Sequence, residues 1–277
     1  MTEIALDVFT CESFELPNGG TFSPTTSTLI TGDTSAMLVD TQYREPEVRE
    51  VIRRVEASGK TLTTIFITHG HFDHYFGLDM LLAQFPYARA VATPAVAAYI
   101  AGNHAAEREF ARSMFGTQAL DSAAVPQPLE SDTVQLDDVL FRVIDLEQAD
   151  IAPTSIVHIP TIGAVIAGDA IYNGVNPFLA ASAPADWPKW VASVERIAAL
   201  NPTTVIAGHK SPARGDDAGC VAETRDYLAK FIELYAASAD SRELVAGMRR
   251  LYPDHVNPSA LVMSAVTAFK HKKRQDA

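Results

Sequence analysis

The feature that most constrains this chain is a short apolar, β-branched segment that ends in a cluster of histidine and aspartate. Residues 64–77 have the sequence TIFITHGHFDHYFG, which places His69, His71, Asp73 and His74 within six positions. In an extended segment, residues two apart project to the same side, so His69 and His71 can bind one ion together. Asp73 and His74 fall where the chain turns toward the next helix, which directs them at a second point. A polar turn rich in histidine is the alternative, and four ligand-type side chains packed this closely argue against it.

Two later apolar segments end in the same way. Residues 164–169 (AVIAGD) close on Gly168 and Asp169, and residues 205–209 (VIAGH) close on Gly208 and His209. Glycine lets the backbone turn sharply beside an ion, and the polar residue then emerges at the carboxyl end of a strand. Taken alone, such a residue could equally be a helix N-cap or a polar strand end.

These segments together carry a family resemblance. The segment HGHFDH resembles the H-x-H-x-D-H signature of the metallo-β-lactamase fold superfamily, and the later Gly-Asp and Gly-His pairs match that family's order. The resemblance implies a four-layer αβ/βα sandwich with two metal positions and a bridging aspartate, Asp169. It assigns the second position to Asp73, His74 and His209, and the first to His69, His71 and one further histidine.

The stretch where that further histidine is expected contains none. Residues 146–153 have the sequence LEQADIAP, and by position Gln148 aligns with the missing ligand. Asp150 and Glu147 are the nearby alternatives. An amide oxygen is a weak zinc ligand compared with an imidazole, whereas Asp150 would be a sound oxygen ligand if the loop turned it inward. His158 lies too far downstream and is expected to be a packed or surface residue.

The resemblance implies chemistry as well as metal ligands. One or two zinc ions are expected, with iron or manganese as competitors, because imidazole and carboxylate ligands suit all three metals. A metal-bound hydroxide would attack a small ester, lactone, thioester or amide-type substrate. Asp73 would orient this nucleophile or accept its proton. Tyr172 lies three residues after Asp169, where a tyrosine of lactone-hydrolysing members helps to hold the substrate oxygen; the alternative is an amphipathic residue at the pocket rim.

Two other functions remain open at this point. His69, His71 and Asp169 form a 2-His-1-carboxylate set, the arrangement of non-haem iron oxygenases. The chain could also be a catalytically silent metal-binding protein. Phe22, Phe178 and two tryptophans could line an apolar pocket, although aromatic residues at such positions are more often core.

The remaining pattern predicts an α/β fold with helices at the C-terminal end. Strands and helices alternate up to about residue 210, with a helical insertion from Thr93 to about Phe115. Helices are then expected at Val221–Ala237, Ser241–Leu251 and Ser259–Phe269. We predict a metallo-β-lactamase-like domain over residues 1–215 and a helical extension over 216–277 packed on it.

Composition narrows the range of partners. The formal net charge of −12 over 277 residues argues against binding to a nucleic-acid backbone. No apolar run is long enough to span a membrane, and the first residues do not show the pattern of a signal peptide. Two isolated cysteines fit a reducing compartment. These features predict a cytoplasmic protein that acts on a small molecule, with a homodimer as a possible assembly.

Overall fold

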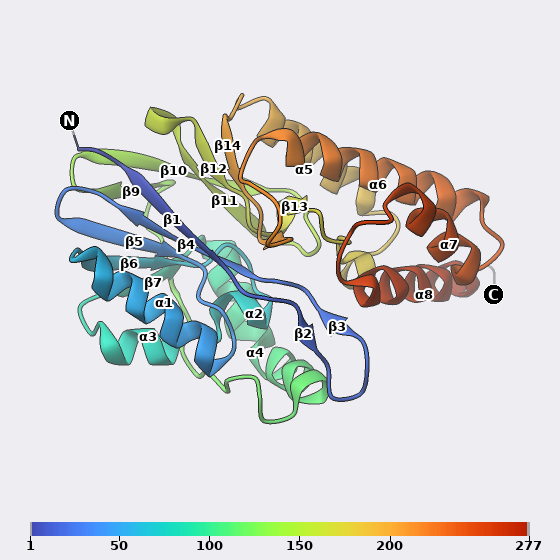
Figure 1. Ribbon diagram of the computed structural model, residues 1–277, viewed down its shortest axis with the longest axis horizontal. Coiled ribbons are helices and arrows are strands. Elements are labelled where there is room, and N and C mark those ends of the chain that lie inside the picture. Colours follow the sequence, from blue (N-terminus) through green and yellow to red (C-terminus); the bar gives the residue numbers. More distant parts are fainter. Residues whose placement is uncertain (1, 276–277) are drawn as a thin grey trace.

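Two β-sheets pack face to face, and helices cover their outer faces. The structure is a computed structural model that describes residues 2–275. The order of the first sheet is β1-β4-β5-β6-β7-β8, and that of the second is β14-β12-β11-β10-β9. Figure 1 shows α1, α3 and α4 beside the first sheet and α5 and α6 beside the second. The predicted four-layer αβ/βα sandwich is therefore confirmed.

The first half of the chain builds the first sheet and its helices. Its strands are β1 (Ala5–Thr10), β4 (Thr26–Thr31), β5 (Ser35–Val39), β6 (Thr61–Phe66), β7 (Arg89–Ala92) and β8 (Gln127–Pro128). Its helices are α1 (Glu45–Ser58), α2 (Phe72–Tyr75), α3 (Leu78–Gln84) and α4 (Pro94–Phe115). A small hairpin of β2 (Phe14–Glu15) and β3 (Thr21–Phe22) stands apart from the sheet.

The second half builds the other sheet and the C-terminal helices. Its strands are β9 (Thr133–Leu136), β10 (Val139–Leu146), β11 (Thr154–Ile159), β12 (Ala164–Ile166) and β14 (Thr204–Ile206), with a separate pair of β13 (Tyr172–Asn173) and β15 (His209–Lys210). Its α-helices are α5 (Trp187–Ala198), α6 (Gly219–Ala237), α7 (Ser241–Leu251) and α8 (Pro258–Gln275). Three short 3₁₀ turns are η1 (Pro160–Ile162), η2 (Gly168–Ala170) and η3 (Leu179–Ala181).

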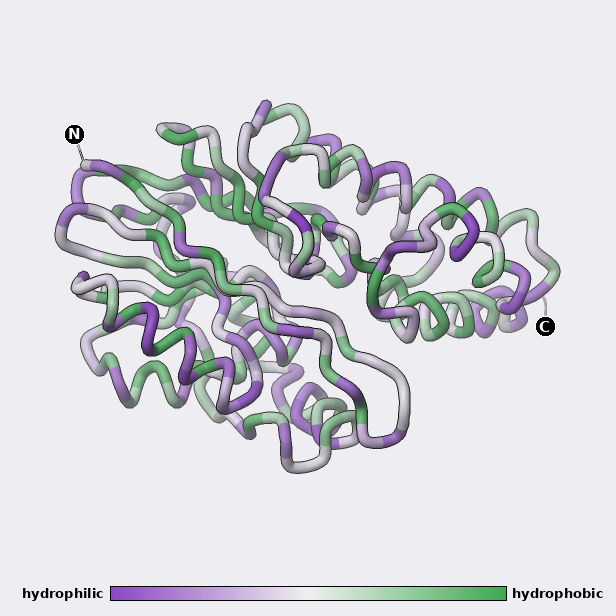
Figure 2. Tube along the Cα trace, in the orientation of Figure 1, coloured by the Kyte–Doolittle hydropathy of each residue, from purple (hydrophilic) through white to green (hydrophobic). Residues whose placement is uncertain are grey.

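Side-chain alternation along each strand explains the layers. In β5, Ala36 and Leu38 face the helices of the first half, whereas Met37 and Val39 face the other sheet. Successive strand residues point to opposite faces, so a strand with both faces covered is apolar throughout. Figure 2 shows hydrophobic stretches along several strands and a mixture of hydrophobic and hydrophilic residues along the helices.

The same alternation divides the core into three layers. One cluster lies between the sheets and includes Phe66 and Phe141. A second lies between the first sheet and its helices. The third packs the second sheet against α5, α6, α7 and α8 through Trp187, Trp190 and Phe231. The C-terminal helices thus share a core with the second sheet, and the proposed division at residue 215 stays a prediction.

The carboxyl ends of β6, β12 and β14 meet at one edge of the sandwich. Strands β5, β6 and β7 run parallel, as do β12 and β14. Backbone hydrogen bonds join the two sheets there: Ser155 N–H donates to Thr68 O (3.0 Å), and Thr26 N–H donates to Gly208 O (2.8 Å). Polar residues that follow these strands are therefore brought together.

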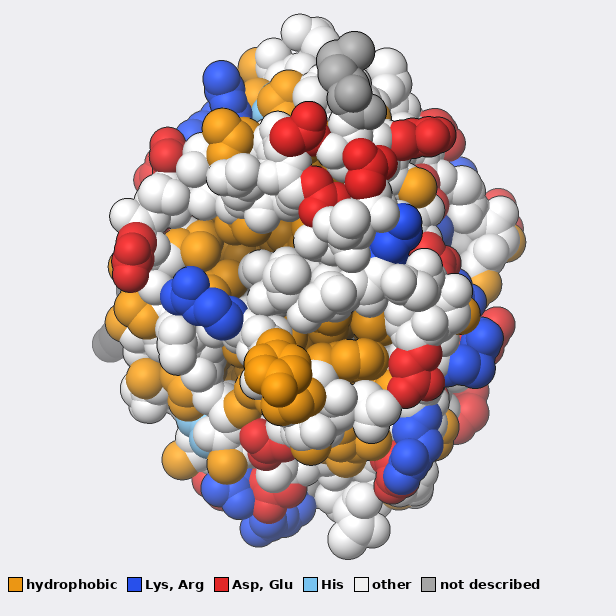
Figure 3. All heavy atoms as spheres, turned by 90° about the vertical axis from the view of Figure 1, so that its left-hand side faces the viewer, with side chains coloured by type: hydrophobic (Ala, Val, Ile, Leu, Met, Phe, Trp, Pro, Cys, Tyr) orange, Lys and Arg blue, Asp and Glu red, His pale blue; other side chains and the backbone are white. Residues whose placement is uncertain are grey.

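The outer surface carries charges of both signs. Figure 3 shows the end of the sandwich away from α8, where acidic and basic side chains are interspersed around hollows lined by hydrophobic ones. Within residues 2–275, none of the helices combines the length and apolarity needed to cross a bilayer.

Candidate metal centre

Seven ligand-type side chains from five separate segments converge at the edge where the strands end. His69 and His71 follow β6, and the short helix α2 carries Asp73 and His74. They form two groups in which every ligand atom lies within 4.8 Å of the others: His69, His71, Asp150 and Asp169 in the first, and Asp73, His74 and His209 in the second.

Asp169 lies between the two groups. Its Oδ1 is 3.2 Å from His74 Nε2, and its Oδ2 is 3.0 Å from His209 Nε2 and 3.8 Å from His69 Nε2. Ligand atoms around a tetrahedral zinc ion with bonds near 2.0 Å are separated by about 3.3 Å. The spacing therefore matches a carboxylate that bridges two ions.

The inner ligand atoms are buried and face one another. His69 Nε2, His74 Nε2 and Asp169 Oδ1 make no hydrogen bond, although His74 Nε2 lies 3.2 Å from Asp169 Oδ1, and Asp150 Oδ2 lies 2.8 Å from His71 Nδ1. Buried polar atoms without partners are costly, and a cation held where these atoms converge would satisfy them. The burial and convergence of these imidazole and carboxylate atoms fit divalent metal ions.

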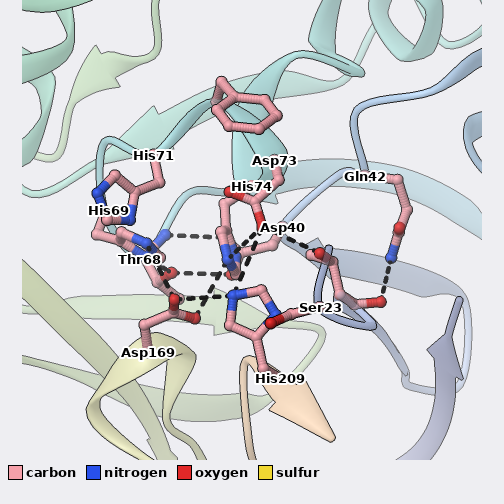
Figure 4. Close-up of polar contacts among 12 residues, drawn as sticks. Ser23, Asp40, Gln42, Thr68, His69, His71, Asp73, His74, Asp169 and His209 are labelled. Atoms are coloured by element: carbon pink, nitrogen blue, oxygen red, sulfur yellow. Dashed lines mark hydrogen bonds and ion pairs between the residues drawn. The ribbon is translucent and has the colours of Figure 1, made fainter. Parts of the chain in front are cut away.

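Contacts outside the ligand groups orient the histidines. His74 Nδ1 lies 2.8 Å from Asp40 Oδ2, His209 Nδ1 lies 2.8 Å from Pro24 O, and His69 Nδ1 lies 3.0 Å from Thr68 Oγ1. Each contact occupies Nδ1 and turns Nε2 inward (Figure 4). Such outer contacts fix the ring orientation of a metal-ligating histidine and select its tautomer.

Asp40 is the most connected of these outer residues. It is 2 % exposed, and its carboxylate also accepts hydrogen bonds from Thr68 N–H (2.9 Å) and Thr68 Oγ1 (2.8 Å). Asp40 thereby ties the end of β5 to the loop that carries the histidines. Sequence reasoning missed it, although the signal was present, because Asp40 follows an apolar strand as Asp169 does.

Two further outer contacts hold the other ligands. Thr25 Oγ1 donates to Asp73 Oδ2 (3.0 Å), and Phe72 N–H at the start of α2 donates to Glu107 Oε2 of α4 (3.0 Å). Burial raises the pKa of Glu107, and His71 partly opposes this effect. The helical insertion therefore braces the ligand loop.

The glycines act as the sequence suggested. Gly168 has φ +48°, and a Cβ there would meet Thr68 Oγ1 at 2.7 Å. A Cβ at Gly208 would overlap the Asp169 carboxylate and lie 2.6 Å from the Gly168 carbonyl carbon. These two strand ends approach so closely that neither position accommodates a side chain.

Asp150, the nearby alternative, lies in the first ligand group. It is fully buried, and its Oδ2 lies 2.8 Å from His71 Nδ1. The Gln148 side-chain amide donates to Ala149 O (3.0 Å), and its backbone N–H donates to Ser193 Oγ (3.3 Å). These contacts favour Asp150 as the fourth ligand, and the choice of Gln148 stays a prediction.

Tyr172 lies against the bridging carboxylate. Its hydroxyl donates to Asp169 Oδ2 (2.9 Å), and its ring centroid is 5.2 Å from that of His209. Burial, followed by the nearby Asp169, raises the pKa of Tyr172 well above its usual range. The hydroxyl therefore keeps its proton at neutral pH.

Electrostatics favour an ionised bridging carboxylate. Burial alone would raise the pKa of Asp169, but the imidazoles of His209, His74 and His69 outweigh it and hold that pKa well below its usual range. Burial, reinforced by His74, lowers the pKa of His69 well below its usual value. Burial lowers the pKa of His74 and His209, but the nearby Asp169 and Asp73 outweigh it and raise both pKa values, so these two imidazoles must release protons when metal binds.

A cavity opens at the ligand groups. Asp73, Asp150, Asp169, Tyr172 and His209 line it. Phe22 and Phe178 line it as well, whereas Trp187 and Trp190 belong to the core.

Comparisons with known proteins agree with this geometry. The family model of the metallo-β-lactamase superfamily matches residues 20–209. A metallo-β-lactamase family protein from Thermus thermophilus has a similar structure (TM-score 0.66, 19% identity, 98% of this chain and 93% of that chain). So do a metallo-β-lactamase from Pontibacter korlensis (TM-score 0.63, 14% identity, 83% and 99%) and FIM-1 from Pseudomonas aeruginosa, a metallo-β-lactamase in mono-zinc form (TM-score 0.58, 18% identity, 82% and 91%). At these identities the likeness shows the fold alone. No curated protein sequence matched the chain.

Proposed function

The chain belongs to the metallo-β-lactamase superfamily, and we propose that it is a metal-dependent hydrolase of small esters, lactones, thioesters or amides. The observation that carries this proposal is the convergence of buried, unpartnered ligand atoms on either side of Asp169. A purely structural role does not explain this arrangement, because hydrophobic side chains packed in the same space would stabilise the fold better.

We assign two metal positions to these residues. His69, His71, Asp150 and Asp169 would hold the first ion, and Asp73, His74, His209 and the bridging Asp169 would hold the second. Zinc suits this set, and the two carboxylates of the first position also suit iron or manganese. When bound, these ions supply a Lewis acid for a substrate oxygen and make water nucleophilic at neutral pH.

The protein's own groups complete the chemistry. Asp73 lines the cavity, where its carboxylate orients the attacking water and accepts a proton from it. The Tyr172 hydroxyl is a buried donor at the same cavity. It gives up its hydrogen bond to Asp169 and donates to the substrate oxygen instead, which stabilises negative charge on that oxygen. The apolar walls exclude bulk water and strengthen both interactions.

The test combines metal analysis with turnover. Protein loaded with zinc, iron or manganese is assayed on a panel of neutral esters, lactones, thioesters and amides, before and after chelation. We expect hydrolysis that chelation abolishes and that falls by about 100-fold or more in His209→Ala. His271→Ala is the matched control, since His271 lies toward the far end of α8. Full activity in the chelated protein would refute the proposal.

The oxygenase alternative meets an obstacle in Asp150. A 2-His-1-carboxylate centre on His69, His71 and Asp169 needs open positions for oxygen and substrate, and Asp150 occupies one of them. Anaerobic metal analysis separates the two functions, since iron with oxygen-dependent turnover would favour the oxygenase. A metal-loaded protein without turnover across the panel would instead indicate a silent metal-binding protein.

A further inference from the structure

The cavity at the ligand groups is too small for a whole substrate. Its volume is about 50 Å³. Typical small-molecule sites have volumes of about 300–1,000 Å³, so this cavity admits only part of such a molecule. A scissile carbonyl and its immediate substituents fill it, so the rest of a larger substrate must lie elsewhere.

A second, larger cavity adjoins the first. Its volume is about 410 Å³, within the range of small-molecule sites. The two cavities share three lining residues, Met114, Ser259 and Met263. The larger one, here called the outer groove, lies between the turn of the β2–β3 hairpin, the end of α4 and the start of α8, elements that stand together in Figure 1.

The junction between the two cavities can adapt its shape. Met114 comes from α4 and Met263 from α8, and both are half-buried. Methionine is unbranched and changes rotamer at low cost, so such a pair can part around an inserted chain. Rotation of these two side chains would therefore open a route from the metal centre to the outer groove without movement of the backbone.

Away from the ligand groups, apolar and neutral polar side chains line both cavities. Phe22, Phe110 and Phe178 line the inner cavity, and Leu16 and Val262 line the outer groove. Among the residues that the structure describes, neither cavity is lined by lysine or arginine. A substrate with a carboxylate or phosphate remote from the reacting bond would find no ion-pair partner here and would lose its hydration.

Resting on the hydrolase function above, we propose that the substrate is an uncharged ester or lactone with an elongated hydrocarbon tail. The carbonyl lies in the inner cavity, and the tail passes between Met114 and Met263 into the outer groove. Hydrolysis adds water across the acyl C–O bond: the carbon gains a hydroxyl oxygen, and the departing oxygen takes a proton. An ester yields an acid and an alcohol, and a lactone yields a hydroxy acid.

The experiment compares chain lengths in matched variants. Metal-loaded protein is assayed on p-nitrophenyl acetate, butanoate, hexanoate and octanoate, with the p-nitrophenyl monoester of a dicarboxylic acid as the charged analogue. Each buried methylene is expected to raise kcat/KM about fourfold. Met263→Trp narrows the junction and should lower the octanoate-to-acetate ratio of kcat/KM by about 10-fold or more, which is the gain from two such methylenes. Leu251→Trp, at the end of α7 (49% exposed) and outside the lining of both cavities, should leave that ratio at the wild-type value.

Binding gives a second measurement that does not depend on turnover. Calorimetry on the metal-free protein should show octanamide binding that Met263→Trp weakens and Leu251→Trp does not. If Met263→Trp does not fold, Met114→Trp narrows the same junction from the other helix. A flat chain-length series together with absent octanamide binding would overturn the proposal, as would a preference for the charged ester. Octanamide binding without turnover of any ester would support the groove and defeat the hydrolase function.

Discussion

Asp40 supports a direct test of how the outer contacts hold the metal centre. The Asp40→Ala substitution removes a carboxylate that accepts from Thr68 N–H, Thr68 Oγ1 and the His74 ring at 2.8–2.9 Å. Thr68 Oγ1 keeps His69 Nδ1 as a partner at 3.0 Å, which leaves two buried donors unsatisfied. At about 1–3 kcal/mol for each such group, the metal-free protein should lose about 2–6 kcal/mol of unfolding free energy.

The same substitution should weaken metal binding. Without Asp40 the His74 ring is free to rotate and to adopt the wrong tautomer, and loss of an outer contact of this kind typically lowers metal affinity about 10–100-fold. Urea unfolding of the metal-free protein measures the first effect, and competition with a chromophoric chelator measures the second. Asp33→Ala is the control, because Asp33 is an exposed carboxylate on the preceding turn that accepts a side-chain hydrogen bond from Thr2. Wild-type metal affinity in Asp40→Ala would refute the role assigned to this carboxylate.

Three further predictions concern the centre and the core. Gly208→Ala should abolish binding of at least one ion, because its methyl group overlaps the Asp169 carboxylate; equilibrium dialysis that finds wild-type binding would contradict this. Removal of metal should lower the melting temperature, since an ion at about 100 times its Kd stabilises the folded state by about 2.7 kcal/mol; calorimetry that finds no shift would show that the ion adds nothing. Phe141→Ala should cost about 3–5 kcal/mol of unfolding free energy, whereas Leu140→Ala, on the opposite face of β10 and 58% exposed, should cost under about 0.5 kcal/mol; equal losses would refute the assigned layers.

The sequence predicted the features that repeat a simple pattern. Short apolar runs became strands, and the helices expected from Thr93 to about Phe115 and after residue 216 formed as α4, α6, α7 and α8. The strand-end residues His69, Asp169 and His209 lie together because parallel strands end at one edge. Strands of two residues, such as those of the β2–β3 hairpin, carry too little pattern to be predicted.

Other features depend on contacts that no local pattern encodes. Asp150 was left as an alternative to Gln148, because only the path of the loop decides which of the two side chains turns inward. His255 lies in a short polar segment between two helices, yet its side chain is 6% exposed, contacts Glu223 at 2.7 Å and stacks on Tyr227. In both cases the partner lies on an element far away in the chain.

Metal stoichiometry on two single variants tests the central claim most directly. We assign Asp150, and not Gln148, to a first metal position beside the one built on Asp73, His74 and His209. Asp150→Ala should therefore lose about half of the metal bound by the wild-type protein, because one of two positions loses a ligand, while Gln148→Ala should keep all of it. Full metal content in Asp150→Ala, or the same loss in Gln148→Ala, would contradict this assignment.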